Sequence, residues 1–527
     1  MNSNEIKKLD KEKIVSTYGR YDLVAESGKG ACCTSADGKK YIDFTAGIGV
    51  NSLGFCDDGW VEAVTAQLKK LQHVSNLFYT EPQVKVADML TSRTGLKKVF
   101  FGNSGAEANE AAIKTARKYG TVNKGENVNK IITLNNSFHG RTMATITATG
   151  QEHYHKFFTP FVGGFDYCDA NDSAQLEKLA DENTCAIMME MIQGEGGVLN
   201  LEEDFVKAAE RICREKDILF IVDEVQTGIG RSGKLFAHEH FGVKPDIVTF
   251  AKGIGGGLPI GGAIFSEKCC DVLKPGDHGT TYGGNPVACA GAVEVLTRMD
   301  DAFLREVEAK GEYITFVDSD DEVEMSTYKK LFDILNVHPD YDILEYPVYE
   351  HYGNLKRQHK LTFGIDKEYT DFSSYWLHGK AYEHTYAWNK IYRKSLFNGV
   401  RYPANKKFED AHTLPLILQK ANIIATTSVG LYYYYDNPKG ITRNANGKDI
   451  SDLLEAHMKV MPKVCDADYY AKVLNIALTA HECTGKYPDF PKMPYNKGIK
   501  PKLNKIIGFK TLCLINKYLH KIYRRDR

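Results

Sequence analysis

The sequence predicts an α/β protein whose main sheet is mostly parallel, with helices on both faces. Residues 97–119 have the pattern of a short strand, a turn of small residues and a helix. Two apolar runs, 218–222 and 246–251, have the continuous hydrophobicity of strands that are buried on both faces. Asp223 and Lys252 directly follow these two runs. We therefore expect both side chains at the sheet edge where open α/β sheets bind ligands.

The composition excludes several classes of protein. The net charge is −1 at pH 7 and the pI is about 7.0, which does not indicate a nucleic-acid-binding polycation. No run of about 18 apolar residues occurs, and the polar start MNSNEIKKLDKEK is unlike a secretory signal. The 12 cysteines form no CxxC pair or disulfide framework. We expect a cytoplasmic protein with reduced thiols.

The chain changes character near residue 310. Residues 1–310 carry a net charge of −7, with 35 glycines and 8 tyrosines. Residues 311–527 carry a net charge of +6, with 11 glycines and 22 tyrosines. No Pro-, Gly- or Ser-rich linker separates them, although natural domains usually meet through an exposed connector. These differences predict two parts of unrelated origin.

In the first part, three features indicate a phosphate-bearing cofactor. Gly105 and Ala106 lie at the predicted helix start, where free N–H groups can hold a phosphate; a simple strand–helix turn is the alternative. Lys252 lies in an apolar, glycine-rich turn, where desolvation lowers an amine pKa and favours imine chemistry; a lysine that reaches solvent is the alternative. Together with Asp223, a carboxylate suited to a pyridinium nitrogen, they form the set that pyridoxal phosphate needs.

Seven stretches of the first part also carry a family resemblance. They occur in order at 43–51, 103–110, 137–142, 193–197, 223–228, 251–253 and 278–286. Through them, residues from about 14 to 310 resemble the class III (subgroup II) pyridoxal-phosphate aminotransferases, most closely the acetylornithine type. The resemblance implies a fold-type I PLP-dependent transferase large domain at 51–310. Residues 1–50 would be the N-terminal segment of the family's small domain.

The resemblance implies a role for each cofactor-binding residue. The turn at 105–106 would hold the phosphate, and Phe138 would stack on the cofactor ring. Asp223 would keep the pyridinium nitrogen protonated, and Gln226 would approach the phenolic oxygen. Lys252 would form the imine with the cofactor and carry the proton at the substrate carbon. The whole implied set is Gly105, Ala106, Phe138, Asp223, Glu224, Val225, Gln226, Lys252 and Thr281.

Further residues are implied to bind substrate or a second subunit. Arg141 would bind a substrate carboxylate, because its planar and always charged fork suits a bidentate contact. Glu195 resembles the acid that, in relatives, switches a second arginine between substrate types. Thr280 and Thr281 would lie close to the partner subunit's site, with Thr281 on the partner's cofactor phosphate. The resemblance therefore implies a homodimer.

The implied activity is transfer of the δ-amino group of N-acetylornithine to 2-oxoglutarate, a step of arginine biosynthesis. Ornithine, succinylornithine and 4-aminobutyrate remain alternative amino donors. The resemblance ends near residue 310, before the segment that completes the small domain in the family and carries the second arginine of ornithine-type relatives. We therefore expect the chain to retain cofactor binding more fully than catalytic turnover.

The second part places carboxylates after an apolar run. Residues 313–317 have the pattern of a buried strand, and Asp318, Asp320 and Asp321 follow it. Clustered carboxylates can bind Mg²⁺ or Mn²⁺ and, through the metal, a diphosphate; an acidic loop or helix cap is the alternative. The stretches 311–321, 387–397, 408–410 and 431–435 make residues 311 to about 440 similar to the C-terminal portion of family 2 GT-A glycosyltransferases.

This second resemblance implies a partial GT-A α/β domain at 311–440. Asp318 and Asp320 would hold the metal on a nucleotide-sugar, and Asp410 would be the general base for an acceptor hydroxyl. Trp388 and Asn389 would line the site. The nucleotide-binding half with which this family opens does not precede residue 311, so activity from this part is not expected.

Residues 441–527 are expected to form a helical, basic tail. From residue 500 to 527 it carries nine Lys and Arg and one Asp, with apolar residues at near-helical spacing. This pattern suits an amphipathic helix on an anionic membrane, or equally a surface helix packed on its own domain.

The two resemblances meet within residues 309–314, and each lacks a portion that its family has. We hypothesise that two unrelated genes are joined there, by recombination or by sequence assembly. The leading interpretation is an aminotransferase in a chimeric chain. The alternatives are a metal-dependent glycosyltransferase that uses a nucleotide-sugar, and a chimera without catalytic activity.

Overall fold

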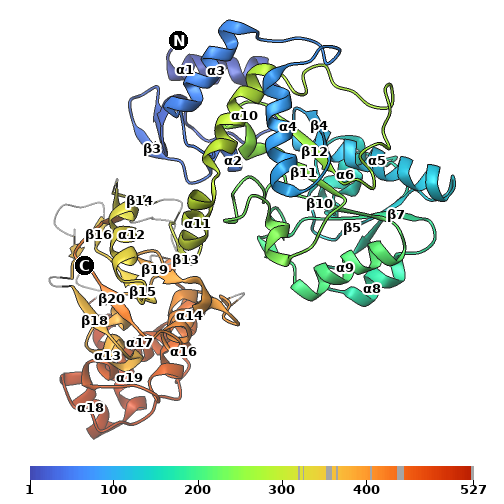
Figure 1. The fold of residues 1–527 in the computed structure, drawn as a ribbon. Coiled ribbons are helices and arrows are strands. Elements are labelled where there is room, and N and C mark those ends of the chain that lie inside the picture. The colour runs from blue at the N-terminus through green and yellow to red at the C-terminus, as the bar shows by residue number, and fades with distance from the viewer. Residues whose placement is uncertain are drawn as a thin grey trace. The chain divides into compact units, whose positions relative to one another are not determined.

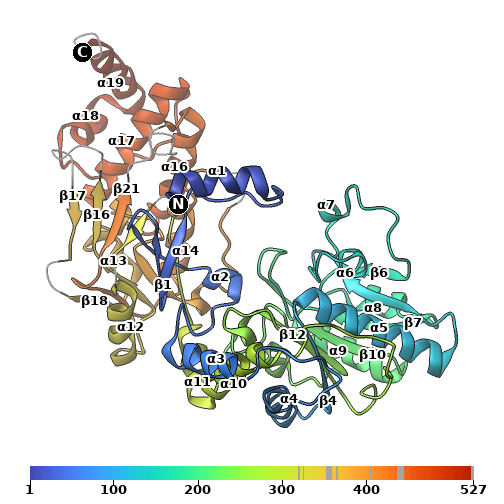
Figure 2. The same ribbon diagram turned by 90° about the horizontal axis from the view of Figure 1, so that it is seen from above.

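A computed structural model describes residues 1–318, 321–324, 326–351, 359–363, 366–403, 406–435 and 444–523. The chain forms two compact units, Met1–Lys310 (unit 1) and Gly311–Arg527 (unit 2). Figures 1 and 2 show the elements of each unit. All 12 cysteines are free thiols. Among the described helices, none has the length and hydropathy needed to span a bilayer.

Unit 1 is built on a seven-stranded sheet with the order β4-β12-β11-β10-β7-β5-β6. Only β12 runs antiparallel to both of its neighbours, so the predicted α/β fold with a mostly parallel sheet is confirmed. The strands are β4 (Lys98–Gly102), β5 (Lys130–Leu134), β6 (Phe165–Cys168), β7 (Thr184–Met189), β10 (Leu219–Asp223), β11 (Ile247–Phe250) and β12 (Gly261–Phe265).

Helices cover both faces of this sheet. On one face, α5 (Gly105–Lys124) packs its alanines and Ile113 against alternate residues of β5, β7 and β10. On the other face, α8 (Ser173–Leu179) and α9 (Glu203–Glu215) cover β5, β7 and β10. There α4 (Glu81–Thr94) and α10 (Pro286–Arg298) cover β11 and β12. Because both faces are buried, the central strands read as unbroken apolar runs.

The elements that carry the predicted site residues differ from expectation only at their ends. Strand β10 ends at Asp223, and β11 ends at Phe250, two residues before Lys252. Helix α5 runs to Lys124 rather than to the predicted Tyr119. Its end is set by Gly125, whose φ of 128° lies in the region that favours glycine.

Most of the remaining elements of unit 1 come from the two ends of its sequence. The N-terminal residues form the antiparallel sheet β1-β2-β3, and residues from 286 onward form the last two helices. Residues 1–50 and 51–310 belong to one compact unit. These further elements are α1 (Ser3–Lys13), β1 (Ala25–Lys29), β2 (Cys32–Ser35), β3 (Lys40–Ile42), α2 (Ala46–Gly49), α3 (Asp58–Lys70), α6 (Met143–Ala148), α7 (Glu152–His155), β8 (Ile192–Gln193), β9 (Leu199–Asn200) and α11 (Asp301–Lys310).

Unit 2 contains two mixed sheets, a five-stranded one with the order β13-β19-β15-β20-β18 and a four-stranded one with the order β14-β21-β16-β17. Strand β13 ends at Thr315, so the predicted strand 313–317 is shorter than expected. The strands are β13 (Tyr313–Thr315), β14 (Glu322–Val323), β15 (Ile343–Glu345), β16 (Val348–His351), β17 (His359–Leu361), β18 (Lys367–Tyr369), β19 (Lys390–Arg393), β20 (Ile424–Thr426) and β21 (Tyr432–Tyr435).

The helices of unit 2 from residue 372 onward share one core with the five-stranded sheet, whereas Leu331 and Leu335 belong to a separate apolar cluster. Ile343, Tyr392 and Ile424 of the sheet pack with buried residues of the C-terminal helices. Residues 441–527 are therefore part of the compact unit rather than a separate tail. The helices are α12 (Thr327–Val337), α13 (Phe372–Leu377), α14 (Glu409–Leu418), α16 (Gly447–Val460), α17 (Ala467–Thr484), α18 (Ile499–Ile507) and α19 (Phe509–Tyr523).

The predicted single basic helix near the C-terminus is two helices. Gly508, with a φ of 80°, separates α18 from α19. Leu512 is only 2% exposed in the core of unit 2, and Asn504 donates a hydrogen bond to the hydroxyl of Tyr470 at 2.9 Å. These contacts favour the interpretation as helices packed on their own unit. Ile506 remains 78% exposed, and membrane contact by 500–527 stays a prediction.

Candidate active site

Most of the predicted cofactor residues of unit 1 meet in one cavity of about 250 Å³. Its walls come from the N-terminus of α5, the loops after β5 and β7, the end of β10 and the turn after β11. Nine of the residues proposed from the sequence for cofactor or substrate lie in these walls. They are Gly105, Ala106, Phe138, Arg141, Glu195, Asp223, Val225, Gln226 and Lys252.

Four hydrogen bonds fix the carboxylate of Asp223, which is 3% exposed at the end of β10. Asn109 Nδ2 donates to Oδ2 at 2.7 Å, and His139 Nδ1 approaches the same oxygen at 2.8 Å. The backbone N–H of Val225 and the hydroxyl of Thr249 donate to Oδ1 at 3.0 and 3.2 Å. A buried carboxylate with this many donors is held in one orientation.

His139 and Glu190 are further residues of the cavity wall that the sequence did not reveal. Burial lowers the pKa of His139, but its hydrogen bond to Asp223 and the charge of Asp223 outweigh burial and raise the pKa above its usual value. Burial raises the pKa of Glu190 to about 7, and its carboxylate accepts the backbone N–H of Phe138 at 2.9 Å. His139 lies within the stretch 137–142, and Glu190 lies shortly before the stretch 193–197. These two stretches were the signal in the sequence that could have pointed to them.

Lys252 is half-buried in the cavity wall and has a strained backbone. Its φ of 47° lies in the left-handed region, where a residue with a side chain costs free energy. Burial lowers the pKa of Lys252, while the charges of Asp223, Glu195 and Glu190 oppose this shift. The ammonium donates to the side-chain oxygen of Gln226. A lowered pKa increases the share of the neutral amine, which is the form that adds to a carbonyl group.

The start of α5 follows a strand and a short turn, as the sequence predicts. Ser104 caps the helix by accepting the backbone N–H of Glu107 at 3.2 Å. Gly105 and Ala106 lie in the first turn, where backbone N–H groups have no intrahelical partner. A Cβ on Gly105 would lie 2.6 Å from a methyl carbon of Val225, so only glycine fits this approach. The turn can therefore hold an anion against the edge of the sheet.

The mouth of the cavity carries the predicted substrate residues. The guanidinium of Arg141 lies 4.2 Å from the ring centre of Tyr154 and 5.7 Å from that of Phe138. Arg141 and Glu195 are both exposed, so their charged ends are accessible to a carboxylate or an ammonium group of a substrate. These contacts stack the guanidinium on aromatic faces and leave its N–H groups for a ligand.

The structure does not bring three predicted residues into this cavity. The side chain of Glu224 is fully buried beside it, where it accepts hydrogen bonds from Thr227 and from the backbone N–H of His238. Thr280 accepts a hydrogen bond from Asn103 Nδ2 at 3.1 Å, outside the cavity wall. Thr281 is exposed next to it. A cofactor contact by Glu224 can therefore involve only its backbone.

In unit 2, the predicted metal ligands are only partly described. Asp318 is exposed after β13, and its backbone N–H donates to the hydroxyl of Tyr432 at 3.0 Å. Asp320 lies outside the described residues. Asp321 accepts hydrogen bonds from the hydroxyl of Tyr432 and the backbone N–H of Tyr435. In the described part of the chain, no group of three or more His, Cys, Asp or Glu is placed to hold a metal.

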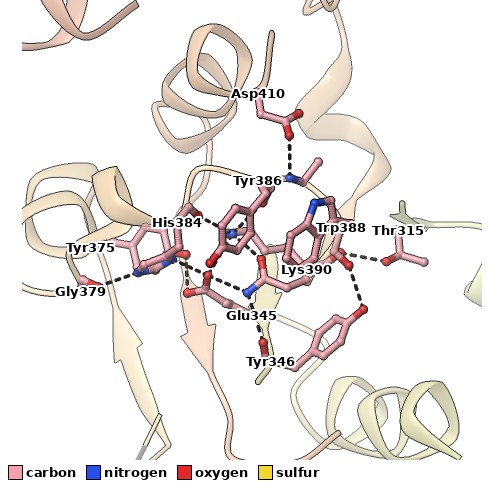
Figure 3. Close-up of polar contacts among 12 residues, drawn as sticks. Thr315, Glu345, Tyr346, Tyr375, Gly379, His384, Tyr386, Trp388, Lys390 and Asp410 are labelled. Carbon is pink, nitrogen blue, oxygen red and sulfur yellow. Dashed lines mark hydrogen bonds and ion pairs between the residues drawn. The ribbon is translucent and has the colours of Figure 1, made fainter. Parts of the chain in front are cut away.

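Asp410, at the start of α14, lies beside a stack of aromatic rings (Figure 3). Its Oδ2 accepts the backbone N–H of Ala387 at 3.2 Å. Burial raises the pKa of Asp410 to about 6, and the charge of Asp318 adds to this shift. Trp388, predicted to line the site, packs with its ring 4.2 Å from that of Tyr386. Asn389 is fully buried instead.

Comparison with known proteins decides the family of the chain. A model of the aminotransferase class-III family matches residues 15–317, more than half of the sequence. The chain belongs to the class-III aminotransferases. The cavity of unit 1, with its buried carboxylate and its lysine, lies within this match. The prediction of a GT-A domain in unit 2 has no such support and stays a prediction.

Named relatives of this class-III aminotransferase agree with the family match. The acetylornithine aminotransferase of Haemophilus ducreyi is 53% identical over 313 residues, which are 59% of this chain and 80% of that protein. The enzyme of the same name from Caldanaerobacter subterraneus is 52% identical, over 58% of this chain and 77% of that protein. A solved structure of the Toxoplasma gondii ornithine aminotransferase, with partial PLP occupancy at its active site, superposes with a TM-score of 0.57 and 33% identity. The superposition covers 64% of this chain and 76% of that one.

The class-III aminotransferase is therefore a PLP-dependent transaminase, and its cavity fits the cofactor. The helix start at 105–106 can hold the phosphate, the carboxylate of Asp223 can hold a proton on the ring nitrogen, and Lys252 can bind the carbonyl carbon. The buried Oδ1 of Asn109, in the cavity wall, has no hydrogen-bond partner among the residues that the structure describes and is available to a ligand. When bound, pyridoxal phosphate supplies the electron sink that stabilises a substrate carbanion.

Proposed function

We propose that the chain transfers the δ-amino group of N-acetylornithine to 2-oxoglutarate in arginine biosynthesis, in the cytoplasm. The observation that carries this proposal is the identity of 53% and 52% to two acetylornithine aminotransferases over most of their length. The solved relative that superposes with a TM-score of 0.57 is an ornithine aminotransferase at the lower identity of 33%. Ornithine, succinylornithine and 4-aminobutyrate are therefore the competing donors.

A comparison of donors tests the proposal. The full chain, loaded with pyridoxal phosphate, is assayed with 2-oxoglutarate and each of the four donors. We expect kcat/KM to be highest for N-acetylornithine, and a higher value for succinylornithine would reassign the acyl group of the donor. A preference for free ornithine or 4-aminobutyrate would reassign the substrate while leaving the transaminase activity intact.

Within this function, we assign Arg141 to the α-carboxylate of the substrate. Arg141→Ala should raise KM for the amino donor roughly 10- to 100-fold, because a hydrogen bond to a charged group contributes about 1.5–3 kcal/mol. Initial rates over a range of donor concentrations measure this effect. Arg211→Ala is the matched control, since this exposed arginine pairs with Glu177 and Glu215 on the far side of the unit 1 sheet. An unchanged KM in Arg141→Ala would remove the assignment.

The proposed enzyme acts as a homodimer through unit 1. Large apolar side chains around residue 79 support this, because Leu77 is 87%, Phe78 63% and Tyr79 100% exposed. Contiguous exposed apolar groups of this kind mark protein interfaces. Asn76 Nδ2 ties the same segment to the carbonyl of Gly283 at 2.8 Å. The predicted contact of Thr280 and Thr281 with a second subunit would thus lie on this surface.

A second candidate function, a metal-dependent glycosyltransferase activity of unit 2, is favoured by one observation. Asp410 is a half-buried carboxyl whose pKa of about 6 suits a general base near neutral pH. If it has this role, with Asp318 and Asp320 on Mg²⁺ or Mn²⁺, the full chain hydrolyses a nucleotide-sugar only in the presence of the metal. Asp410→Asn should reduce this hydrolysis about 10²-fold or more, whereas the exposed control Asp340→Asn should not. Hydrolysis that is absent in the wild type removes this candidate.

A further inference from the structure

A fully buried ion pair lies directly beneath the aromatic stack of unit 2. Lys390, the first residue of β19, and Glu345, the last residue of β15, are both 0% exposed. Lys390 Nζ lies 2.9 Å from Glu345 Oε1. Figure 3 shows how the two side chains meet between the strands. Removing two charges from water is costly, and well-packed apolar residues in their place are often as stable, so stability alone does not explain the pair.

Lys390 also ties together a loop of the same chain. Its ammonium lies within hydrogen-bond distance of the backbone carbonyls of His384, at 3.1 Å, and of Tyr386, at 2.9 Å. It approaches the side-chain oxygen of Asn389 at 2.7 Å. Because one buried cation holds two carbonyls two residues apart, residues 384–389 are curled around it.

Glu345 fixes the other side of this loop. His384 Nδ1 lies 2.8 Å from its Oε1, and Asn389 Nδ2 donates to the same oxygen at 3.2 Å. The hydroxyl of Tyr375 donates to Oε2 at 2.7 Å. Burial raises the pKa of Glu345, but the charges of His384 and Lys390 outweigh burial and hold it well below its usual value. The carboxylate is thus a charged anchor that holds the side chains of Tyr375, His384, Asn389 and Lys390.

The curled loop contacts Asp410 through Ala387 and carries the ring of Trp388 in the aromatic stack. The backbone N–H of Ala387 donates to its carboxylate at 3.2 Å. The ring of Trp388 lies parallel to those of Tyr386, at 4.2 Å, and Tyr434, at 5.4 Å, with 3° between each pair of planes. Figure 3 shows Asp410 on one side of the loop and Lys390 with Glu345 on the other.

We propose that Lys390 and Glu345 are positioning residues, which hold residues 384–388 so that Ala387 contacts Asp410 and Trp388 keeps its place in the aromatic stack. The proposal deepens the second candidate function, on which the catalytic meaning of Asp410 rests. The pair touches no substrate in this role and acts through the loop. Its loss should therefore change the geometry at Asp410 even where the fold of unit 2 is retained.

Four variants of the full chain test the proposal by near-ultraviolet circular dichroism and thermal unfolding. The difference between wild type and Trp388→Phe defines the signal of the stacked rings. Lys390→Met should lose this signal and unfold at a lower temperature, because Glu345 is left buried without its cation. Lys390→Met/Glu345→Gln should regain most of the thermal stability and still lack the signal. Lys459→Met, which breaks an exposed pair with Glu455, should change neither.

The double variant separates a positioning role from a structural one. If its ring signal returns together with its stability, the pair is merely structural and the proposal is overturned; a signal that persists in Lys390→Met overturns it as well. Where wild type hydrolyses a nucleotide-sugar, the double variant should lose about 10²-fold in kcat, as expected for a misplaced reacting group. If the wild type shows no hydrolysis, the second candidate function fails, while the ring signal still decides the positioning role.

Discussion

Replacing Lys252 by alanine should lower the transamination rate of the full chain by about 10³-fold or more. This lysine is the half-buried amine of the cofactor cavity, and we assign to it both the bond to the cofactor and the proton transfer at the substrate carbon. Positioned proton transfer alone contributes about 10²–10⁴-fold to a rate. The rate with N-acetylornithine and 2-oxoglutarate measures the loss, and the visible absorption of the bound cofactor should shift in the same variant.

A matched lysine separates this effect from general damage to unit 1. Lys268 is also partly buried, and it pairs with Asp217 at 3.0 Å away from the cavity. Lys268→Ala should keep the rate and the absorption band of the wild type. A Lys252→Ala protein that turns over normally would mean that another amine serves the reaction.

The second large effect is expected at Asp223. Asp223→Asn should lower kcat/KM on the order of 10²–10³-fold, because a fixed charge directed at the reacting system is lost. The variant keeps the shape of the side chain, so the cavity should still form. Steady-state rates together with circular dichroism measure the loss and confirm that the fold is retained.

Asp246 provides the control for this carboxylate. It lies at the opposite end of the neighbouring strand and accepts the backbone N–H of Phe220 at 3.0 Å. Asp246→Asn should lower stability without a comparable loss of kcat/KM. An Asp223→Asn enzyme with the rate of the wild type would show that the carboxylate does not hold a proton on the ring nitrogen.

Much of unit 1 could be predicted from the sequence because its signals are local. The apolar runs before Asp223 and Lys252 are strands buried on both faces, and short continuous apolar runs are typical of such strands. The turn at 105–106 is likewise fixed by small residues, since Val225 leaves no room for a Cβ on Gly105. Strand ends could not be placed as well, because they depend on pairing with distant segments.

What the sequence did not reveal depends on contacts between distant residues. Asn109 and His139 lie 114 and 84 residues from Asp223 and still fix its carboxylate. Glu224 follows Asp223 directly, yet the alternation of a strand end turns it toward His238 instead of the cavity. In unit 2, Lys390 and Glu345 are charged residues, which a sequence pattern predicts to be exposed. Only the fold shows that they are buried together.

Chemical trapping tests the assignment of the cofactor site most directly. Reduction of the enzyme loaded with pyridoxal phosphate by borohydride fixes the cofactor on the lysine that binds it, and mass spectrometry of the peptides then identifies that residue. We predict one modified lysine, Lys252, and no modification of unit 2. Modification of a different lysine, or of none at full cofactor loading, would contradict the site described in unit 1.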